Sequence, residues 1–330
     1  ELEYGRCPEH RTELETIEEE NYFFRLSRYQ KDIEHILQDS VIKVFPESRK
    51  NEMLAFVNRG LQDFSISRTV ERAHGWGVPV PGDDNQIMYV WFDALSNYIN
   101  GLNFAGDGDL YKKYWLQEGQ KERASTHILG KGVAKFHLIY WIGMLLSAKI
   151  PLPTSQFVHG YITVNGEKMS KSSGNVIAPL EIVNKYGQDP ARYYFLAALS
   201  AYQDGDYSKE RFAEIYAAHL VNGVGNLVAR VLTMIEKYNG GKVPPVADDI
   251  FDTLGFWKKY HESFGRFAFH EVAQLIHSLV NACDIVITES KPWEKFAWGQ
   301  SIEPILYRLT ETLRHIALSI LPVLPETGKE

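Results

Sequence analysis

The sequence predicts an α/β part followed by an all-α part. In the first part a strand-like segment, 126–129, leads through the glycine turn 130–132 into an apolar helix over 133–148. This order is typical of α/β folds. From about residue 208 onward, hydrophobic residues recur at steps of three and four, which indicates amphipathic helices. The change from one pattern to the other falls near residue 205.

Earlier elements of the α/β part follow from helical spacing and from alternation. Helices are expected over 26–38 and near 50–60, with an extended segment between them. Residues 86–91 alternate between apolar and polar side chains, as a half-buried strand does. A further helix is expected to begin at Asp93.

Turn signals divide the remainder of the chain. Residues 157–164 read as one strand that ends in Asn165-Gly166, a strong signal for a two-residue hairpin turn. The first helix of the all-α part is expected to close at the glycines of 239–241. Two more helices are expected, one near 252–288 and one over 301–320. The helix near 252–288 is expected to be broken.

Composition excludes several classes of protein. Of the 330 residues, 45% are hydrophobic and 23% are charged, which excludes disordered and collagen-like chains. The net charge of −7 means that any contact with nucleic acid must come from a local patch. Two cysteines, Cys7 and Cys283, cannot form a disulfide framework, so a cytoplasmic location is expected. The apolar stretch 136–148 is too short to span a bilayer, so no membrane association is expected.

A loop rich in lysine and hydroxyl groups gives the strongest chemical signal. It reads Lys168-Met169-Ser170-Lys171-Ser172. Lysine is a flexible point charge that can follow a phosphate as charge develops, and hydroxyl groups donate hydrogen bonds. The string matches the signature loop of class I aminoacyl-tRNA synthetases, and the run 159–168 resembles methionyl-tRNA synthetases. The resemblance extends over nearly the whole chain. It implies that these five residues bind ATP with its Mg²⁺, and that Lys168 and Lys171 are catalytic.

Two other segments resemble the methionine pocket of this family. An aromatic wall with a few polar groups suits a thioether, which is apolar and polarizable. The residues at matching positions are Trp91, Ala94, Leu95, Tyr98, Val133, Phe136 and His137. Taken singly, each of these side chains fits a hydrophobic core better than a ligand site. Their joint spacing before the lysine–serine loop is what assigns them to methionine.

The same resemblance assigns Arg68 and Gly130. Arg68 is expected to act in catalysis by reaching a carboxylate or phosphate, because a guanidinium fork suits either anion. As an isolated arginine it would instead form a surface ion pair. Gly132 stands where the family usually has an aspartate that assists substrate binding. Gly130 is therefore expected to contact ATP through its backbone.

Cys7 and His10 have the spacing of half a zinc knuckle. A complete site needs four ligands, and Cys283 lies far along the chain in a predicted helix. The resemblance places a knuckle in the insertion that ends here. Zinc is therefore expected only if the knuckle is complete.

The helical part resembles the anticodon-binding region of the family. Asn226 and Arg230 lie four residues apart on one helix face, within a segment that is similar to the anticodon-reading helix. Trp293 ends a Lys-Pro-Trp motif that is similar to the matching tryptophan motif. An amide and a guanidinium can read base edges, and an indole can stack on an unstacked base. Without the resemblance, these residues read as a solvated helix face and the cap of a helical core.

These assignments predict a second half of a Rossmann-type class I synthetase catalytic domain followed by a helical-bundle anticodon-binding domain. The predicted parts are the end of a connective insertion with the half knuckle (1–60), the second half of the catalytic domain (61–155), the lysine–serine loop with the stem-contact region (156–205) and the anticodon-binding domain (206–330). None of the 11 histidines fits the second class I signature, His-x-Gly-His. The chain therefore resembles the later portion of a synthetase that lacks the N-terminal half of its catalytic domain.

The resemblance implies ATP-dependent activation of methionine and its transfer to methionine tRNA. A separate N-terminal chain is then a further expected partner, and the isolated chain is expected to be inactive. Two alternatives stay open. In the first, the chain is a catalytically incomplete tRNA-binding fragment or a subunit of a split synthetase. In the second, it belongs to a class I synthetase for another amino acid.

Overall fold

The computed structural model describes residues 18–117, 119, 123–169, 174–245 and 251–330. The chain divides into two compact units. The first contains the described residues up to His127 together with Gly132–Gln156, and the second contains Ile128–Lys131 and Phe157–Glu330. Strands β7 (Thr126–Gly130) and β8 (Ser155–His159) each begin in the first unit and end in the second.

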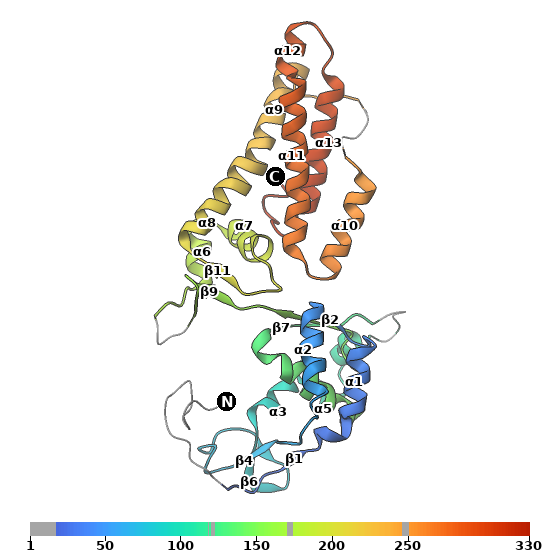
Figure 1. Ribbon diagram of the computed structural model, residues 1–330, viewed down its shortest axis with the longest axis vertical. Coiled ribbons are helices and arrows are strands. Elements are labelled where there is room, and N and C mark those ends of the chain that lie inside the picture. Colours follow the sequence, from blue (N-terminus) through green and yellow to red (C-terminus); the bar gives the residue numbers. More distant parts are fainter. Residues whose placement is uncertain (1–17, 118, 120–122, 170–173, 246–250) are drawn as a thin grey trace. The chain divides into compact units, whose positions relative to one another are not determined.

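Short sheets and helices alternate along the first unit (Figure 1). Strands β4, β6 and β5 form an antiparallel sheet in that order, β1 pairs with β3, and a third sheet has the order β2-β8-β7. The elements before β7 are β1 (Phe23–Phe24), η1 (Leu26–Tyr29), α1 (Gln30–Gln38), β2 (Lys43–Phe45), α2 (Glu47–Val57), β3 (Phe64–Ser65), β4 (Ser67–Thr69), β5 (Pro79–Val80), β6 (Asp83–Met88), α3 (Val90–Leu95), α4 (Asn97–Asn100), η2 (Phe104–Gly106) and η3 (Tyr111–Leu116).

Most of the predicted elements of this unit are present, with shifted ends. The helix expected from Asp93 begins three residues earlier, at Val90, because Tyr89 is extended and ends the strand there. The helix expected over 133–148 is present as a continuous helical run whose turns differ in type. It contains the 3₁₀ turn η4 (Lys131–Val133), the π-helical turn η5 (Phe136–Tyr140) and α5 (Trp141–Ala148).

A cluster of buried aromatic and aliphatic side chains holds the first unit together. Trp115 and Trp141 meet edge to face, with ring centroids 6.4 Å apart, and each is almost fully buried. Leu95 and Leu145 pack in the same cluster. Large aromatic side chains bury 150–250 Å² each, so they dominate the energetics of such a core. The cluster fixes α3 against α5, and thereby places the side chains of α3 beside those of η5.

The strand expected over 157–164 is two strands that belong to different sheets. Strand β8 ends at His159, and β9 (Ile162–Val164) pairs with β10 (Glu167–Lys168) and β11 (Gly205–Tyr207). Gly160 lies at the break. A Cβ atom there would come within 2.0 Å of the carbonyl oxygen of Gln203, so only glycine fits. The prediction of one continuous strand was wrong because this close approach redirects the chain.

The predicted hairpin turn at Asn165-Gly166 is confirmed. Both residues have positive φ, 52° and 80°, and Val164 pairs with Glu167 across the turn. Asp206 of β11 braces this hairpin, because its carboxylate accepts hydrogen bonds from Thr163 Oγ1 and from the backbone N–H of Gly166, each at 2.7 Å. These bonds lower the pKa of Asp206, so the carboxylate is charged at neutral pH. The brace fixes the strand that leads into the lysine–serine loop.

The rest of the second unit is helical. The helical pattern expected beyond residue 208 is present, whereas the helices between residues 179 and 198 were not predicted. Its helices are α6 (Pro179–Tyr186), α7 (Gln188–Tyr193), η6 (Tyr194–Ala198), α8 (Lys209–Ile215), η7 (Tyr216–Gly225), α9 (Asn226–Asn239), α10 (Thr253–Gly265), α11 (Phe269–Ser290), α12 (Pro292–Ala297) and α13 (Glu303–Ile320). Helices α9, α11 and α13 run alongside one another around a core that contains Leu227, Val231, Val272 and Leu306, all fully buried (Figure 1). Helix α9 ends at Asn239 before Gly240, whose φ of 60° requires a residue that tolerates the left-handed region.

One helical run among the described residues, Lys209–Asn239, is long and apolar enough to cross a membrane by length and composition alone. Leu227 and Val231 of this run are fully buried in the bundle core. We therefore assign the run to the bundle.

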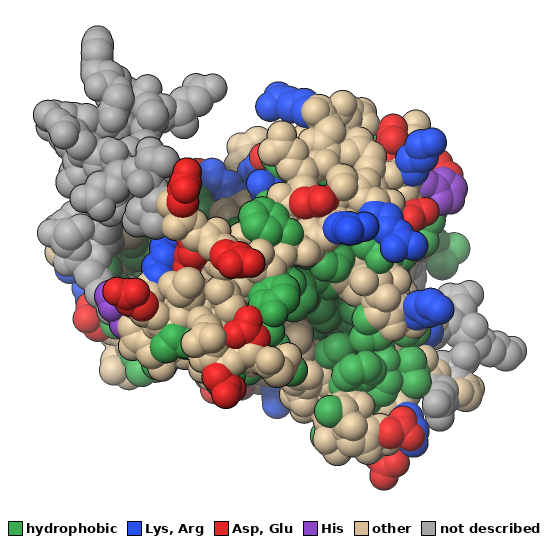
Figure 2. Space-filling view, turned by 90° about the horizontal axis from the view of Figure 1, so that it is seen from below, with side chains coloured by type: hydrophobic (Ala, Val, Ile, Leu, Met, Phe, Trp, Pro, Cys, Tyr) green, Lys and Arg blue, Asp and Glu red, His purple; other side chains and the backbone are tan. Residues whose placement is uncertain are grey.

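Hydrophobic side chains also reach the surface. Figure 2 shows them gathered in a hollowed part of one face. Three tryptophans are prominently exposed, namely Trp76 at 76%, Trp298 at 70% and Trp293 at 44%. An indole exposed to this extent contributes little to a hydrophobic core. Where exposed apolar groups gather in a patch, the patch marks a binding surface.

Candidate functional site

The predicted methionine-binding residues of α3 and η5 come together in the first unit. The rings of Trp91 and Phe136 stack, with centroids 4.2 Å apart and planes inclined by 16°. Both side chains are partly exposed, so their outer surfaces can meet a ligand. Leu95 is different: it is 2% exposed and belongs to the core beneath. Ala94, beside it, is half-buried.

Tyr98 and His137 form a hydrogen bond next to this stack. The hydroxyl of Tyr98 lies 2.7 Å from Nε2 of His137, and Nδ1 of His137 lies 2.9 Å from the carbonyl oxygen of Val133. A carbonyl can only accept, so Nδ1 carries the proton and Nε2 accepts from the tyrosine. Burial lowers the pKa of His137 and raises the pKa of Tyr98, so both groups are neutral at pH 7. The cluster formed by these residues and the Trp91–Phe136 stack is therefore aromatic and uncharged.

His127 of β7 was not predicted to belong to this group. Its ring stacks on that of Tyr98, with centroids 4.2 Å apart. His127 itself is only 6% exposed. Burial, together with the nearby His137, lowers the pKa of His127 to about 4. Its Nδ1 atom is buried and has no hydrogen-bond partner among the described residues. The alternation of β7, in which His127 and Leu129 are buried, was the available sequence signal.

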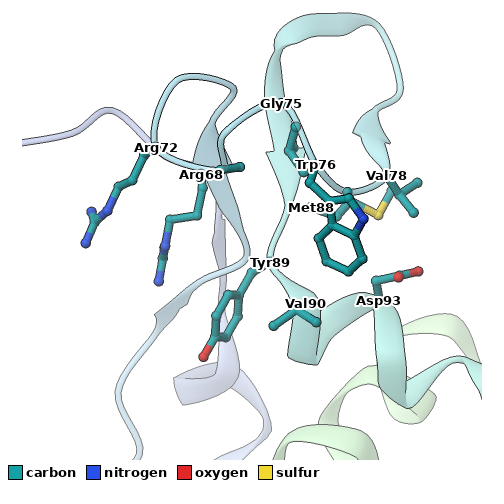
Figure 3. Close-up of a pocket in the computed structure, with 12 residues that line it drawn as sticks. Arg68, Arg72, Gly75, Trp76, Val78, Met88, Tyr89, Val90 and Asp93 are labelled. Carbon is teal, nitrogen blue, oxygen red and sulfur yellow. The ribbon is translucent and has the colours of Figure 1, made fainter.

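Arg68 lines a different hollow of the first unit. It lies in β4, and its guanidinium Cζ is 4.7 Å from the centroid of the Tyr89 ring. Its Nη1 donates to Ser65 Oγ and to the carbonyl oxygen of Ser67, both at 2.9 Å. The hollow has a volume of about 630 Å³ (Figure 3), and of the predicted site residues only Arg68 lines it. Val90 and Asp93 of α3 line this hollow with Arg68, whereas Trp91 and His137 do not.

The described part of the lysine–serine loop begins at the end of the β9–β10 hairpin. Lys168 is exposed, and Met169 packs against the small core that contains Val164 and Tyr207. The side-chain amide of Asn175 donates to the carbonyl oxygen of Lys168 at 3.2 Å. The other predicted residues of this loop, Ser170, Lys171 and Ser172, lie outside the described residues.

Tyr161 lies between two lysines of the second unit. The ammonium nitrogen of Lys131 is 4.8 Å from the centroid of the Tyr161 ring, and that of Lys168 is 5.7 Å from it. Asp204 completes the group: its carboxylate pairs with Lys131 at 2.7 Å and accepts from the backbone N–H of Tyr161 at 2.9 Å. Gly130, which precedes Lys131, is half-buried, and a Cβ there would contact the ring of His159 at 3.5 Å. Asp204 offsets the charge of Lys131, so the exposed Lys168 carries the positive charge at the start of the loop.

A second hollow lies in the helical bundle. Arg230 of α9 and Trp293 of α12 both line it, together with Thr233 and Met234, and its volume is about 310 Å³. Arg230 Nη1 donates to Asp284 Oδ1 at 2.6 Å. Asn226 begins α9 one turn before Arg230 and is exposed. The exposure of Trp293 excludes a role as a fully buried core residue.

The predicted half zinc knuckle, Cys7 and His10, lies outside the described residues. Within the part of the chain that the structure describes, no three His, Cys, Asp or Glu side chains are grouped closely enough to hold a metal ion. Cys283 is a buried free thiol in α11, and burial raises its pKa to about 12, so it packs as a small apolar side chain.

Comparison with known proteins decides the family. The model of the family described as tRNA synthetases class I (M) matches residues 1–232. The chain belongs to this family. It is 38% identical over 98% of its length to methionine–tRNA ligase of Synechocystis sp., and 40% identical over 99% to that of Thermosynechococcus vestitus.

Solved structures agree with this assignment. Mycobacterium tuberculosis methionyl-tRNA synthetase bound by methionyl-adenylate matches 98% of the chain with a TM-score of 0.84 at 34% identity. The chain spans 62% and 63% of the length of the two ligases and 64% of the mycobacterial structure. The expected class I catalytic fold is thereby shown for the α/β part.

In addition to His127, the sequence analysis missed three candidate functional residues, namely Lys131, Tyr161 and Asp284. Lys131 follows Gly130, whose backbone was the stronger signal. Lys131 and Tyr161 are 30 residues apart in sequence, and only the fold brings the ammonium group over the tyrosine ring. Asp284 lies in the apolar run of α11, where nothing in the sequence marks it as the partner of Arg230.

Proposed function

We propose that this class I synthetase takes part in methionine–tRNA ligation, in which methionine is activated with ATP and transferred to methionine tRNA. The observation that carries the proposal is the uncharged aromatic cluster of Trp91, Phe136, Tyr98 and His137. A thioether has no charge and no strong hydrogen-bonding group, so it gains from dispersion against aromatic faces. A neutral hydroxyl–imidazole pair adds polarity without the cost of burying a charge.

Activation places its charge on the phosphates. A carboxylate oxygen of methionine attacks the α-phosphorus of ATP, and the bond to the bridging oxygen breaks so that pyrophosphate leaves with the electron pair. Cations beside the triphosphate stabilise the charge that moves onto this leaving group. Lys168 and Lys171 would serve in this way, and Mg²⁺ would arrive with the ATP as part of the substrate. Gly130 would contact the nucleotide through its backbone.

Transfer needs the tRNA. A ribose hydroxyl at the end of the tRNA attacks the acyl carbon of methionyl-adenylate, and AMP leaves. We propose that Asn226, Arg230 and Trp293 bind the anticodon of methionine tRNA during this step. The support is that Arg230 and a half-exposed indole line one hollow, where a base can stack and meet a guanidinium.

Amino-acid-dependent exchange of pyrophosphate into ATP tests the proposal. Exchange is measured with methionine, leucine and cysteine, for this chain alone and with a complementing N-terminal chain, while calorimetry measures methionine binding. We expect binding that is selective for methionine, and exchange that needs the complementing chain. Equal binding of leucine would show that the pocket serves another amino acid.

A second candidate function is tRNA binding without catalysis. The hollow beside Arg230 is formed entirely by residues of the second unit, so it does not depend on the aromatic pocket. In that case the chain binds methionine tRNA, yet supports no exchange even when complemented. The same two measurements separate the two functions.

A further inference from the structure

Three side chains of the second unit meet at a point that has no part in the proposed function. The hydroxyl oxygen of Tyr193 lies 2.8 Å from Nδ1 of His219 and 2.5 Å from Nε2 of His277. The two imidazole rings lie edge to face, with centroids 4.4 Å apart and planes inclined by 62°. Two ring nitrogens and one oxygen therefore converge, although the histidines are 26 and 84 residues from the tyrosine in sequence.

Each of the three side chains comes from a different helical element. Tyr193 ends α7, His219 lies in η7 and His277 lies in α11. The segment η7 is π-helical over ten residues, and π-helical turns are rare and frequently lie at functional sites. Because η7 packs against α11, the backbone holds the two imidazoles at this spacing.

The two imidazoles are neutral and partly accessible to solvent. Tyr193 is buried, whereas both histidines are only partly buried. Burial lowers the pKa of His219, and burial together with the neighbouring His219 lowers the pKa of His277 to about 4. Both rings are therefore uncharged at pH 7, which is the form in which histidine binds a metal ion.

The spacing of these atoms suits a small transition-metal ion. Bonds from Zn²⁺ to histidine nitrogen are about 2.0 Å long, so two ligand atoms of a tetrahedral site lie about 3.3 Å apart. The observed separations of 2.8 and 2.5 Å come within about 1 Å of this value, so small side-chain rotations are sufficient. Imidazole nitrogen suits Zn²⁺ and Cu²⁺, whereas Mg²⁺ prefers carboxylate, carbonyl and water oxygens.

We propose that Tyr193, His219 and His277 form a binding site for a divalent transition-metal ion of the zinc or copper type. Nδ1 of His219, Nε2 of His277 and the phenol oxygen are its ligands, and water takes the fourth position. An imidazole that has its proton on the facing nitrogen takes its other tautomer, and the phenol proton passes to solvent. Among the described residues no three His, Cys, Asp or Glu side chains are grouped for a metal, because the third ligand here is a tyrosine.

Loss of the phenol proton gives the site a measurable signature. Burial raises the pKa of Tyr193, so this phenol is protonated in the metal-free protein. A bound metal ion favours the ionised form of its ligand and opposes the effect of burial. Ionised tyrosine has its own ultraviolet absorption, so metal binding at this site is separable from binding elsewhere on the chain.

Titration of the metal-free 330-residue chain with Zn²⁺ tests the site. Tyrosinate absorption should grow with added Zn²⁺ and saturate, and an excess of Mg²⁺ should not reverse it. His219→Gln and His277→Gln should each raise the Zn²⁺ concentration for half-saturation by more than about a hundred-fold. This is the upper range for loss of a group that only supports a ligand. Tyr193→Phe should bind Zn²⁺ more weakly, by calorimetry, and give no tyrosinate signal.

Two further variants are controls. His261→Gln removes an exposed imidazole of α10 and should respond to Zn²⁺ as the parent chain does. Cys7→Ser disrupts the predicted half zinc knuckle and should leave the tyrosinate signal unchanged. Thermal unfolding without metal identifies any variant that does not fold. If His277→Gln is such a variant, the partly exposed His219 decides through His219→Gln.

Three outcomes overturn the proposal. Absence of a tyrosinate signal in the parent chain shows that the three side chains form a hydrogen-bonded contact only. An equal response of the parent and His219→Gln shows that the imidazole is not a ligand. Loss of the signal in Cys7→Ser shows that the metal binds at the half knuckle. Since none of the three residues is assigned to methionine, ATP or the anticodon, failure of the proposed function leaves this inference unaffected.

Discussion

The hydroxyl of Tyr98 donates a hydrogen bond to Nε2 of His137 over 2.7 Å. The bond joins α4 to the π-helical turn η5, two elements 39 residues apart in sequence. It also fixes the imidazole as the tautomer with its proton on Nδ1, because that atom faces the carbonyl oxygen of Val133. The Tyr98 hydroxyl and the Val133 carbonyl together orient the imidazole, and burial keeps it neutral.

Replacing Tyr98 by phenylalanine should destabilise the protein and weaken methionine binding. The variant leaves Nε2 of His137 buried without its donor, which costs about 1–3 kcal/mol. Tyr111→Phe is the matched control, since Tyr111 is a buried tyrosine of the same core whose hydroxyl bonds no described residue. Urea unfolding and methionine calorimetry on both variants make the comparison. Equal losses in the two variants would mean that the hydroxyl–imidazole bond has no special weight.

His127 should make the stability of the protein fall in mild acid. Burial holds its pKa at about 4, below the ordinary value of 6.5. As the pH falls below 6.5 the unfolded chain takes up this proton first, so unfolding becomes more favourable. The loss is up to about 1.4 kcal/mol per pH unit until the pH reaches about 4.

Urea unfolding at pH 7, 6 and 5 measures this slope. The parent chain also contains His277, whose pKa burial lowers to about 4, so the difference between variants is the relevant quantity. His127→Gln should have a shallower dependence on pH than the parent. Parallel curves would mean that His127 is charged or exposed in the native protein.

The sequence was sufficient where short-range geometry decides the structure. Asn165-Gly166 predicts a two-residue turn because both positions need positive φ, and the structure has them. The apolar spacing beyond residue 208 predicts helices because a buried face must repeat with the helical period. The family is likewise indicated by a short contiguous string, Lys168 to Ser172, whose meaning does not depend on how distant segments pack.

Long-range approaches were not predictable in this way. Gly160 ends a strand because the backbone of Gln203, 43 residues later, comes against it. Arg68 was expected to reach a carboxylate or phosphate, but nothing in the sequence indicated that it would line a hollow together with residues of β6 and α3. Leu95 matches a pocket position but points into the core. Each of these outcomes depends on which elements pack together.

Tyr161 should control how ATP is used without affecting methionine. Its ring attracts Lys131 and Lys168, and such contacts contribute about 0.5–2 kcal/mol. In the complemented enzyme Tyr161→Leu should slow pyrophosphate exchange about two- to thirty-fold, whereas Tyr161→Phe, which keeps the ring, should not. The methionine Kd should be the same in all three proteins. A parallel loss of methionine affinity would show that Tyr161 supports the fold as a whole.

The hollow of the helical bundle should discriminate between anticodons. A base stacked on Trp293 contributes about 1–3 kcal/mol, so Trp293→Ala should weaken binding of methionine tRNA about five- to a hundred-fold. Arg230 is held by Asp284 at 2.6 Å, which directs its guanidinium toward a base edge. Asp284→Asn should therefore keep most of the binding but reduce the preference for methionine tRNA over a copy with an exchanged anticodon. Arg230→Gln should remove that preference.

Thermal unfolding of the same variants separates recognition from packing. Truncating a buried tryptophan costs about 3–5 kcal/mol, whereas a side chain that is 44% exposed should cost far less. Trp298→Ala serves as the control, because it removes an exposed indole that does not line the hollow. We expect Trp293→Ala to unfold close to the parent temperature and to lose its preference between the two tRNAs. If it unfolds early and keeps that preference while folded, Trp293 supports the bundle and does not read the anticodon.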